Sequence, residues 1–548
     1  MSDGELAFRQ GIDPATAGHP RVEPRTDHVD GMLVERDAAV AMRDGVRIWV
    51  DVYRPEDAEP VPTLVAWSPY GKHAPVSYDI FPNSGVRPEW ISRHAGFEAP
   101  DPGYWVPRGY AVVNVDPRGL WYSEGEATFL TNQEAEDVYD LVEWAAAQEW
   151  SNGRVGMTGV SYLAMIQWRA AALRPPHLAA INPWEGVSDA YREFAGHGGM
   201  LERRFVSMWQ ARRVAYSTSR VEDLVENGRR HPLLDGYWLG KNPDLAAIGV
   251  PAFVVASWSD QGLHTRGTLR AFAEIGSDKK WLWIHGRKKW EHYYRPENVE
   301  RLRQFFDRFL KGVESGVEGW PRVWMEVRDR FYEGELRSEA DWPLARTRYE
   351  PLYLNATDRS LARAPVEPES EVTYNSEVED DRIQFDHRFE VDTELIGPMK
   401  LKLWVEALEA DDMDLFVAVQ KLDVAGDVVP FSFLNSLEDG PVALGWLRVS
   451  HRELDLDRST PERPWHTHRR EERLQPGEVV PVEVEVWPSG TRFRAAETLR
   501  LIVQGSDIYR YDEHVVWMEH ATRNRGRHVI HCGGRYDSHL LVPVTTPA

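Results

Sequence analysis

The sequence predicts an α/β fold built on a mostly parallel sheet and followed by an all-β domain. Short apolar runs such as residues 63–67 and 110–115 end in turn residues, which is typical of strands buried on both faces. Stretches with helical periodicity separate these runs, and this alternation indicates a doubly wound sheet. After about residue 318 short alternating runs dominate, which favours an all-β sandwich, as in a jelly roll.

The expected elements follow from apolar spacing and turn residues. Expected strands of the first part are residues 46–53, 63–67, 110–115, 153–159, 250–256 and 280–284, and expected helices are 132–145, 163–173, 265–275 and 299–310. Expected strands of the second part are residues 322–327, 384–391, 401–405, 414–420, 480–486 and 498–504.

These elements predict four segments. Residues 1–35 are polar and lack clear periodicity, so they are expected to form an irregular N-terminal arm. Residues 36–187 and 248–317 form the α/β core. Residues 188–247 interrupt the alternation and are rich in charged residues and tryptophan, which suggests a helical cap insertion. Residues 318–548 form the jelly-roll domain.

Composition excludes several classes of protein. The chain of 548 residues carries 87 acidic and 64 basic residues, a net charge of −23, without a Lys/Arg-rich run. We therefore expect no nucleic-acid partner. No segment has enough consecutive apolar residues to span a membrane, and the N-terminus does not resemble a secretory signal. A single cysteine, Cys532, excludes an internal disulfide and fits a cytoplasmic location.

A candidate nucleophile stands between an expected strand and an expected helix, in Gly159-Val160-Ser161-Tyr162. A serine in such a sharp turn exposes its hydroxyl, and the next backbone N–H points at the developing oxyanion. This arrangement is typical of the nucleophile elbow of an α/β-hydrolase. Ala164 departs from many elbows, which have glycine near the helix start, and its methyl group is expected to tighten the packing.

Acid and base should follow in the order Ser, acid, His. Asp260 follows the strand at 250–256, where the acid is expected, although it could instead cap the next helix. Two histidines compete as the base. His285 directly follows the strand at 280–284, and His292 lies seven residues further on. His264, in the loop after Asp260, is expected to be a pocket residue.

Tyr70, in Ser68-Pro69-Tyr70-Gly71-Lys72, follows the strand at 63–67. The loop at this position of an α/β-hydrolase supplies the second oxyanion donor, and a phenol can serve. On the residues alone, an ordinary buried tyrosine is the favoured interpretation of Tyr70.

Several motifs together resemble one family. They are Ser68-Pro69-Tyr70-Gly71-Lys72, Asp116-Pro117-Arg118-Gly119, Ser123-Glu124-Gly125, Glu136-Asp137, Trp150-Ser151-Asn152-Gly153-Arg154-Val155-Gly156-Met157, Gly159-Val160-Ser161-Tyr162-Leu163 and Pro175-Pro176-His177-Leu178. In this order the chain resembles the cocaine esterase and X-Pro dipeptidyl-peptidase family (peptidase S15), which includes α-amino-acid ester hydrolases. The resemblance covers nearly the whole chain.

The resemblance implies an α/β-hydrolase core with an inserted cap and a C-terminal jelly roll. It implies an oxyanion hole made by the Tyr70 hydroxyl and the Tyr162 N–H. It also implies a catalytic triad of Ser161, Asp260 and a histidine. A Trp-x-His match favours His292, whereas position after the strand favours His285, which we take as the expected base. Oligomers among relatives imply a homo-oligomer by analogy only.

The expected reaction is hydrolysis of an ester or amide bond through an acyl-Ser161 intermediate. Trp121, Trp184 and His264 are expected to line the pocket for a small-molecule substrate. Acyl transfer to an acceptor other than water would use the same site, and a degenerate binding protein is the alternative outside enzymes. No cofactor or metal is expected, because the acidic residues Asp411, Asp412 and Asp414 are typical of a solvated turn.

Overall fold

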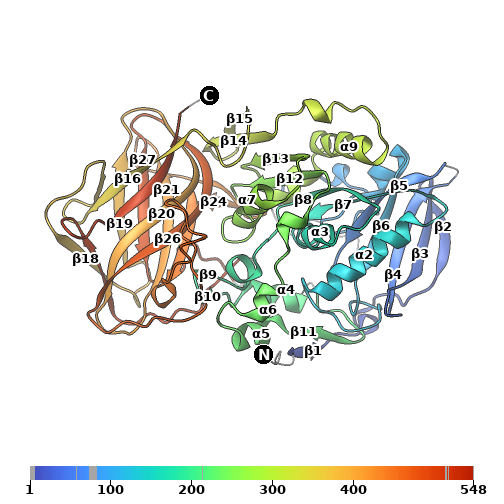
Figure 1. Cartoon of the computed structure of the whole chain (residues 1–548), viewed down its shortest axis with the longest axis horizontal. Helices are drawn as coiled ribbons and strands as arrows, with labels where there is room; N and C mark the ends of the chain where they lie inside the picture. The colour runs from blue at the N-terminus through green and yellow to red at the C-terminus, as the bar shows by residue number, and fades with distance from the viewer. Residues whose placement is uncertain are drawn as a thin grey trace.

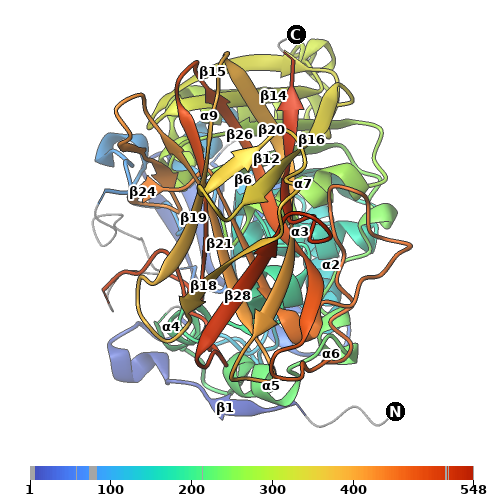
Figure 2. The same cartoon turned by 90° about the vertical axis from the view of Figure 1, so that its left-hand side faces the viewer.

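The computed structural model describes residues 6–56, 59–72, 83–212, 214–512, 515 and 517–546. The chain forms two main parts side by side, with the C-terminal β part on the left and the α/β part on the right of Figure 1. Figure 2, turned to bring the β part to the front, shows its strands lying over the α/β part. Within the described residues, no helix is both long and apolar enough to cross a membrane.

A single twisted sheet organises the α/β part. Its strands are β2 (Arg25–Val29), β3 (Met32–Ala41), β4 (Arg47–Pro55), β5 (Val61–Trp67), β6 (Ala111–Asp116), β7 (Ser151–Val160), β8 (Leu178–Trp184), β12 (Ala252–Ser257), β13 (Lys280–His285), β14 (Val323–Arg330) and β15 (Glu333–Glu339). The strand order is β2-β3-β4-β6-β5-β7-β8-β12-β13-β14-β15, and the strands are parallel from β6 to β14. Parallel strands place their carboxyl ends at one edge of the sheet, where ligands bind in this class of fold.

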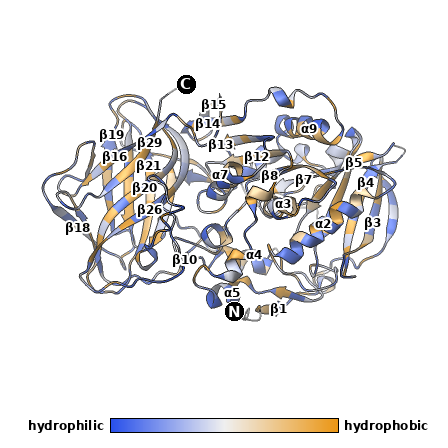
Figure 3. Cartoon of the chain, viewed as in Figure 1, coloured by the Kyte–Doolittle hydropathy of each residue, from blue (hydrophilic) through white to orange (hydrophobic). Residues whose placement is uncertain are grey.

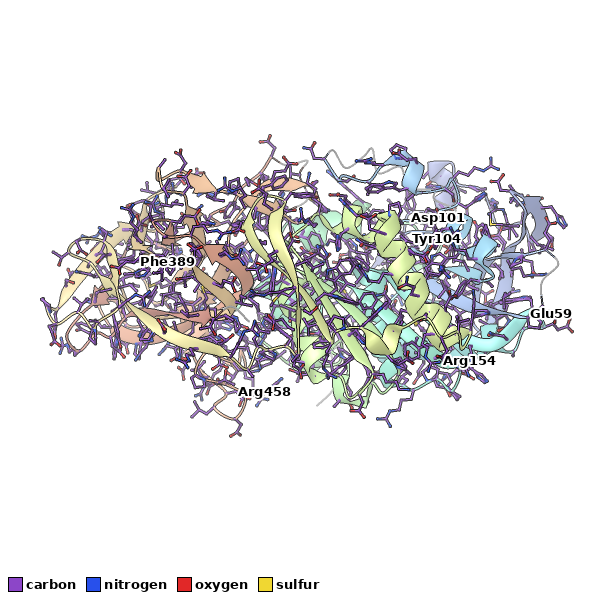
Figure 4. The ribbon with its side chains drawn as sticks, turned by 90° about the horizontal axis from the view of Figure 1, so that it is seen from above. Glu59, Asp101, Tyr104, Arg154, Phe389 and Arg458 are labelled. Atoms are coloured by element: carbon purple, nitrogen blue, oxygen red, sulfur yellow. The ribbon has the colours of Figure 1, made fainter. Side chains whose placement is uncertain are left out.

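Helices pack against this sheet. They are α1 (Pro102–Trp105), α2 (Asn132–Ala146), α3 (Tyr162–Ala172), α7 (Thr265–Glu274), α8 (Lys289–Tyr294) and α9 (Pro296–Leu310), with short helices η3 (Pro88–Trp90), η4 (Val106–Arg108) and η7 (Val317–Gly319). Figure 4 shows Tyr104 of α1 beside α9, and its hydroxyl lies 2.9 Å from Oε2 of Glu300. Trp105 contacts Phe306 edge-on, with ring centroids 5.9 Å apart, so α1 and α9 pack together.

The N-terminal segment corrects one expectation, because much of residues 8–35 is regular structure. β1 (Phe8–Gln10) pairs antiparallel with β11 (Arg220–Glu222) of the cap, η1 (Pro14–Ala17) follows it, and β2 pairs with β3. β2 lies at the edge of the sheet and reads Arg-Thr-Asp-His-Val, with no buried residue. Such an edge strand carries no apolar signal in the sequence. Residues 1–5 lie outside the described part.

The cap is less helical than expected. Residues 188–247 contain the π-helical turn η5 (Tyr191–Ala195), β9 (Gly196–His197), β10 (Met200–Leu201), α4 (Phe205–Arg212), β11, α5 (Leu224–Arg230), α6 (Gly236–Leu239) and η6 (Leu245–Ala247). None of these helices exceeds eight residues, so the segment must be stabilised by packing rather than by helix propensity. In Figure 1 its helices α4, α5 and α6 lie at the lower centre, below the adjoining side of the α/β part.

The β part has its own apolar core. Its elements are β16 (Thr347–Asn355), β17 (Ser360–Ala362), β18 (Ser370–Asn375), β19 (Arg382–Arg388), β20 (Thr393–Ala407), β21 (Asp414–Leu422), β22 (Val428–Val429), β23 (Phe431–Phe433), β24 (Leu437–Gly440), β25 (Ala443–Arg448), η8 (Val449–His451), β26 (Val479–Phe493), β27 (Thr498–Gln504), β28 (Arg527–Cys532) and β29 (His539–Thr545). Neighbouring long strands are antiparallel, as β20 is to β26. Figure 3 shows apolar residues concentrated in the strands of both main parts.

The boundary between the two main parts differs from the expected position after residue 317. β14 pairs parallel with β13 and thereby continues the core sheet, and β15 forms its last strand. The alternating pattern of residues 322–327 occurs in edge strands of an α/β sheet as well as in strands of a β sandwich. The sequence therefore could not show to which of the two main parts this strand belongs. β14 also touches the β part, where Arg328 pairs with Thr491 of β26.

Candidate active site

Ser161 lies at the end of β7 and directly before α3, in a strained turn. Its backbone has φ 60° and ψ −114°, a conformation that residues other than glycine rarely adopt. Its N–H donates to the carbonyl oxygens of Trp184 and Glu185, at 3.0 and 3.1 Å. The strain is therefore maintained by hydrogen bonds to the end of the neighbouring strand, β8.

Two glycines provide the space that this turn requires. A Cβ on Gly159, which has φ +148°, would lie 2.5 Å from Cβ of Leu163, so the helix could not approach the strand. A Cβ on Gly186 would lie 3.0 Å from Cβ of Ala164. The methyl group of Ala164, the departure noted in the sequence, thus lies against a residue that has no side chain.

A histidine and an aspartate stand in line with the serine. Oγ of Ser161 lies 3.2 Å from Nε2 of His264, and Nδ1 of His264 forms a short hydrogen bond with Oδ2 of Asp260. Asp260 and His264 are both fully buried. The backbone N–H of His264 donates to the carbonyl oxygen of Asp260 at 3.2 Å. This single helical turn brings the side chains of Asp260 and His264 together, although they are four residues apart in the sequence.

The charges around this line are unevenly distributed. Burial alone would raise the pKa of the Asp260 carboxyl, but Lys289 and His264 together hold it below its usual range. Burial and the positive charge of Lys289 lower the pKa of His264, against the opposing effect of Asp260. Asp260 is thus an anion beside an imidazole that stays neutral, which is the state a general base requires.

The structure does not bring His285 or His292 to the serine hydroxyl. Nε2 of His285 lies 3.1 Å from Oε1 of Glu185, and the ring of His292 packs on His285 and Trp283. Burial, His285 and nearby arginines lower the pKa of His292 well below its usual value. The sequence predicted His285 as the base and His264 as a pocket residue, whereas in the structure it is His264 whose ring lies within hydrogen-bond distance of the serine hydroxyl, and His285 binds Glu185.

The expected oxyanion donors lie at the carboxyl ends of adjacent strands. Tyr70 follows β5, and Tyr162 follows β7, with which β5 pairs in parallel. The hydroxyl oxygen of Tyr70 accepts the indole N–H of Trp209 in the cap at 3.3 Å. The N–H of Tyr162 belongs to the first residue of α3, where backbone N–H groups have no acceptor within the helix.

The two tryptophans expected in the pocket have different surroundings. The indole of Trp121 packs directly against Gly71, and a Cβ on Gly71 would lie 2.3 Å from it. Trp121 therefore lies beside the loop that carries Tyr70. Trp184 is fully buried and packs against His285, His292 and Tyr293. Trp184 therefore belongs to the core beneath the site. The role of Trp121 stays a prediction.

The acidic residues of the β part are paired rather than gathered around a cavity. Asp414 accepts two hydrogen bonds from Arg448, at 2.7 and 2.8 Å, and Asp412 accepts the Ser450 hydroxyl. Asp411 is exposed. Among the described residues, no three His, Cys, Asp or Glu side chains lie close enough together to hold a metal ion.

Two residues of the site were not identified from the sequence. Lys289 donates to Asp260, and Glu185 holds both His285 and the hydroxyl of Ser257. Neither belongs to a motif named above, and Lys289 follows two other basic residues, Arg287 and Lys288, in a short stretch that is typical of a solvated surface. The i, i+4 spacing of Asp260 and His264 was visible in the sequence, and it was the signal that could have identified His264.

The sheet order, the elbow at Ser161 and its histidine and aspartate define an α/β-hydrolase. Residues 44–294 match the family model of the X-Pro dipeptidyl-peptidase (S15 family), and residues 315–541 match that of the X-Pro dipeptidyl-peptidase C-terminal non-catalytic domain. A CocE/NonD family hydrolase from Staphylococcus aureus is 41% identical, with a TM-score of 0.92 over 100% of this chain and 99% of that one. The chain therefore belongs to the CocE/NonD family of serine hydrolases, within the S15 group.

Curated relatives carry esterase and peptidase names. Cocaine esterase from a Rhodococcus species is 31% identical over 390 residues, which are 60% of this chain and 64% of that protein. A putative Xaa-Pro dipeptidyl-peptidase from Bacillus anthracis is 23% identical over 357 residues, or 58% of this chain and 57% of that protein. The chain thus matches about three fifths of the length of these two relatives, and they differ in the bond they are named for.

Proposed function

We propose that this protein cleaves an ester or amide bond of a small acyl substrate through a covalent acyl-Ser161 intermediate. The observation that carries the proposal is the line of hydrogen bonds from Ser161 through His264 to Asp260. Serine is a weak nucleophile until an adjacent base removes its proton, and an oriented, neutral imidazole is such a base. The matching esterase and peptidase relatives support the same chemistry.

The residues of the site have separate roles in the proposed reaction, and His264 acts in both of its steps. His264 accepts the Ser161 proton through Nε2 as Oγ attacks the substrate carbonyl, and Asp260 holds Nδ1–H and stabilises the imidazolium. The Tyr70 hydroxyl and the Tyr162 N–H stabilise the tetrahedral oxyanion. His264 then gives the proton to the leaving alcohol or amine. Water activated by the same imidazole releases the acid.

The role of the base is thus proposed for His264 and not for His285. The support is the 3.2 Å separation of Oγ and Nε2, together with the binding of His285 to Glu185. A jelly-roll arrangement of the β part and a homo-oligomeric state stay predictions from the resemblance. Acyl transfer to another acceptor would use the same residues.

The test is labelling with a fluorophosphonate together with a burst assay on p-nitrophenyl acetate and butyrate. Wild type is expected to be labelled at Ser161 and to release a burst of about one p-nitrophenol per site. Ser161→Ala should lose both label and burst. Ser151→Ala, at the opposite end of β7, is the matched control and should keep both. Label in Ser161→Ala, or no label in folded wild type, would refute the acyl-enzyme.

A parallel panel separates the two bond types. Aminoacyl and Xaa-Pro p-nitroanilides present an amide, and their cleavage releases p-nitroaniline, which is followed by absorbance as p-nitrophenol is for the esters. Turnover of the anilides at a kcat/KM within about tenfold of the esters would support a peptidase. Turnover of the esters alone would support an esterase, since amides have the poorer leaving group.

A further inference from the structure

Lys289 brings a positive charge to the buried pair of Asp260 and His264. It is the first residue of α8, and its side chain is 5% exposed. Its Nζ lies 2.7 Å from Oδ2 of Asp260 and 3.0 Å from Nδ1 of His264. An ammonium group is rarely buried without a specific partner, because it loses its hydration.

The protons can be assigned along this contact. An ammonium group only donates, so Lys289 donates to Oδ2 of Asp260, and Nδ1–H of His264 donates to the same oxygen. Both donors contact the same oxygen, and their nitrogen atoms, Nζ and Nδ1, lie 3.0 Å apart. Within the described residues, Oδ1 of Asp260 has no hydrogen-bond partner. This arrangement leaves the Nε2 lone pair facing Ser161.

The opposite assignment would inactivate the site. If Lys289 donated to Nδ1, the ring proton would reside on Nε2 and point at Oγ of Ser161. The imidazole could then not accept the serine proton. The contact of Lys289 with Asp260 at 2.7 Å and the short contact of His264 with the same oxygen favour the productive assignment.

Charged groups from four segments act on this cluster. They are Asp260 after β12, Lys289 on α8, Glu185 after β8 and Glu98 before α1. Burial would lower the pKa of Lys289, but Asp260, Glu185 and Glu98 raise it, so the amine stays charged. Burial and then Lys289 lower the pKa of His264, whereas Asp260 and Glu185 act to raise it.

We propose that Lys289 is a positioning residue for the reaction at Ser161, which fixes the Asp260 carboxylate and keeps the His264 imidazole neutral in mildly acidic solution. This inference rests on the function proposed above. A neutral imidazole is the active form of the base, so a nearby fixed cation extends activity to lower pH. The same cation opposes the imidazolium that forms in the transition state, and this limits the maximal rate.

The test is the pH dependence of kcat/KM for p-nitrophenyl acetate in wild type, Lys289→Met and Lys289→Arg. In wild type, kcat/KM should fall in acid with an apparent pKa, here called the acid limb, that lies below the ordinary histidine pKa of about 6.5. Lys289→Met should move that limb upward by about one pH unit or more, since removal of a charge at this distance shifts a pKa by about that amount. Lys289→Arg retains the charge and should stay within about half a unit of wild type.

Lys288→Met is the matched control, because Lys288 pairs with Glu438 of the β part instead, and its acid limb should equal that of wild type. An unchanged limb in folded Lys289→Met would overturn the inference. So would a rise in kcat/KM below about pH 6.5, where the inference expects a loss, because that result would mean that Lys289 donates to Nδ1. If Lys289→Met does not fold, the downfield Nδ1 proton of wild type can be titrated by NMR. An imidazole pKa at or above about 6.5 would also overturn the inference.

Two further variants separate this inference from the proposed function. Loss of the burst in Ser161→Ala and in His264→Ala tests the acyl-enzyme and its base, whatever Lys289 does. A burst that survives in His264→Ala would refute the proposed base. If the acid limb is the same in Lys289→Met as in wild type, while Ser161→Ala and His264→Ala lose the burst as expected, only the role of Lys289 is refuted.

Discussion

The imidazole rings of His285 and His292 pack together with centroids 3.9 Å apart, and they lie against Trp184 beneath the elbow. Both histidines are buried, and His285 binds Glu185, whose carbonyl oxygen accepts the Ser161 N–H. This pair therefore supports the strained turn from below, whereas His264 approaches the serine hydroxyl. The distinction yields a direct comparison of variants.

His264→Ala is expected to lower the rate of acylation by about 10⁴-fold or more, as removal of a triad histidine does elsewhere. His285→Ala should retain the burst and lose less than about tenfold. It should also lower the free energy of unfolding by about 1–3 kcal/mol, because Glu185 keeps its burial but loses a partner. Stopped-flow burst kinetics and thermal unfolding measure the two effects. Equal loss of acylation in both variants, with folds intact, would contradict this assignment.

The hydroxyl of Tyr70 is expected to act in the transition state. Tyr70→Phe should lower kcat by about 10²–10³-fold with little change in KM, because one oxyanion donor is lost. Trp209→Phe, the matched variant, removes the indole N–H that binds the Tyr70 oxygen but retains an aromatic ring, and it should cost less than about tenfold. Steady-state kinetics with p-nitrophenyl acetate compares them. A Tyr70→Phe effect confined to KM would mean that Tyr70 binds substrate instead.

A chain of hydrogen bonds connects the β part to the loop that carries Asp260 and His264. Nδ1 of His520 lies 2.8 Å from Oδ1 of Asp507, Nε2 of His520 lies 2.7 Å from Nδ1 of His197, and Nε2 of His197 lies 2.6 Å from the Gly262 oxygen. Burial would lower the pKa of His520, but Asp507 raises it; burial and His520 lower that of His197 well below its usual value. His520 is thus the cation, and neutral His197 donates to Gly262.

Asp507→Asn should destabilise the protein most in acidic solution. A histidine whose folded pKa is raised adds stability that is fully present below about pH 6.5 and is lost as the pH rises through its folded value. The difference in free energy of unfolding between wild type and Asp507→Asn should therefore shrink from pH 5.5 to pH 9. Denaturant unfolding at several pH values measures it. A difference that grows with pH would mean that His520 is neutral.

The sequence predicted the central strands of the core because each is an apolar run bounded by turns. It missed β2 because an exposed edge strand needs no apolar residues. It also attached residues 322–327 to the wrong sheet, since β14 alternates like a strand of the β part but pairs with β13. Strands that pair in a sheet are often distant in the sequence, and the local periodicity of one strand does not show which strand it pairs with.

Ser161 and Asp260 could be identified because both follow a buried strand directly. The expected histidine was placed by the same rule, yet His285 turns toward Glu185 and His264 reaches the serine through one turn of backbone. The direction of a side chain at the end of a strand depends on contacts across the sheet. Lys289 likewise resembles a surface residue in the sequence, but its position at the start of α8 buries its side chain in the structure.

Glu134 is a buried carboxyl behind the elbow, and it accepts the hydroxyl of Tyr162 and the indole N–H of Trp67. Burial raises its pKa to about 7 against these hydrogen bonds. A raised folded pKa gives stability that is present below the unfolded value and lost as the pH rises through about 7. Glu134→Gln should therefore gain about 1–3 kcal/mol relative to wild type between pH 5 and pH 8. Denaturant unfolding at both pH values checks this, and a constant difference would contradict it.

The contact between Gly186 and Ala164 tests how the elbow accommodates its methyl group. Gly186→Ala would place a Cβ 3.0 Å from Cβ of Ala164 and 3.2 Å from the N–H nitrogen of Met165, so the first turn of α3 would have to move. We expect a loss of about 1–3 kcal/mol in the free energy of unfolding. We also expect a fall in the acylation rate, since α3 positions the Tyr162 N–H.

Ala164→Gly in the Gly186→Ala background removes one side of the clash and should restore part of the lost stability and part of the lost acylation rate. A double-mutant cycle on unfolding and on burst rate measures the coupling. Additive effects would show that the two residues do not share this space.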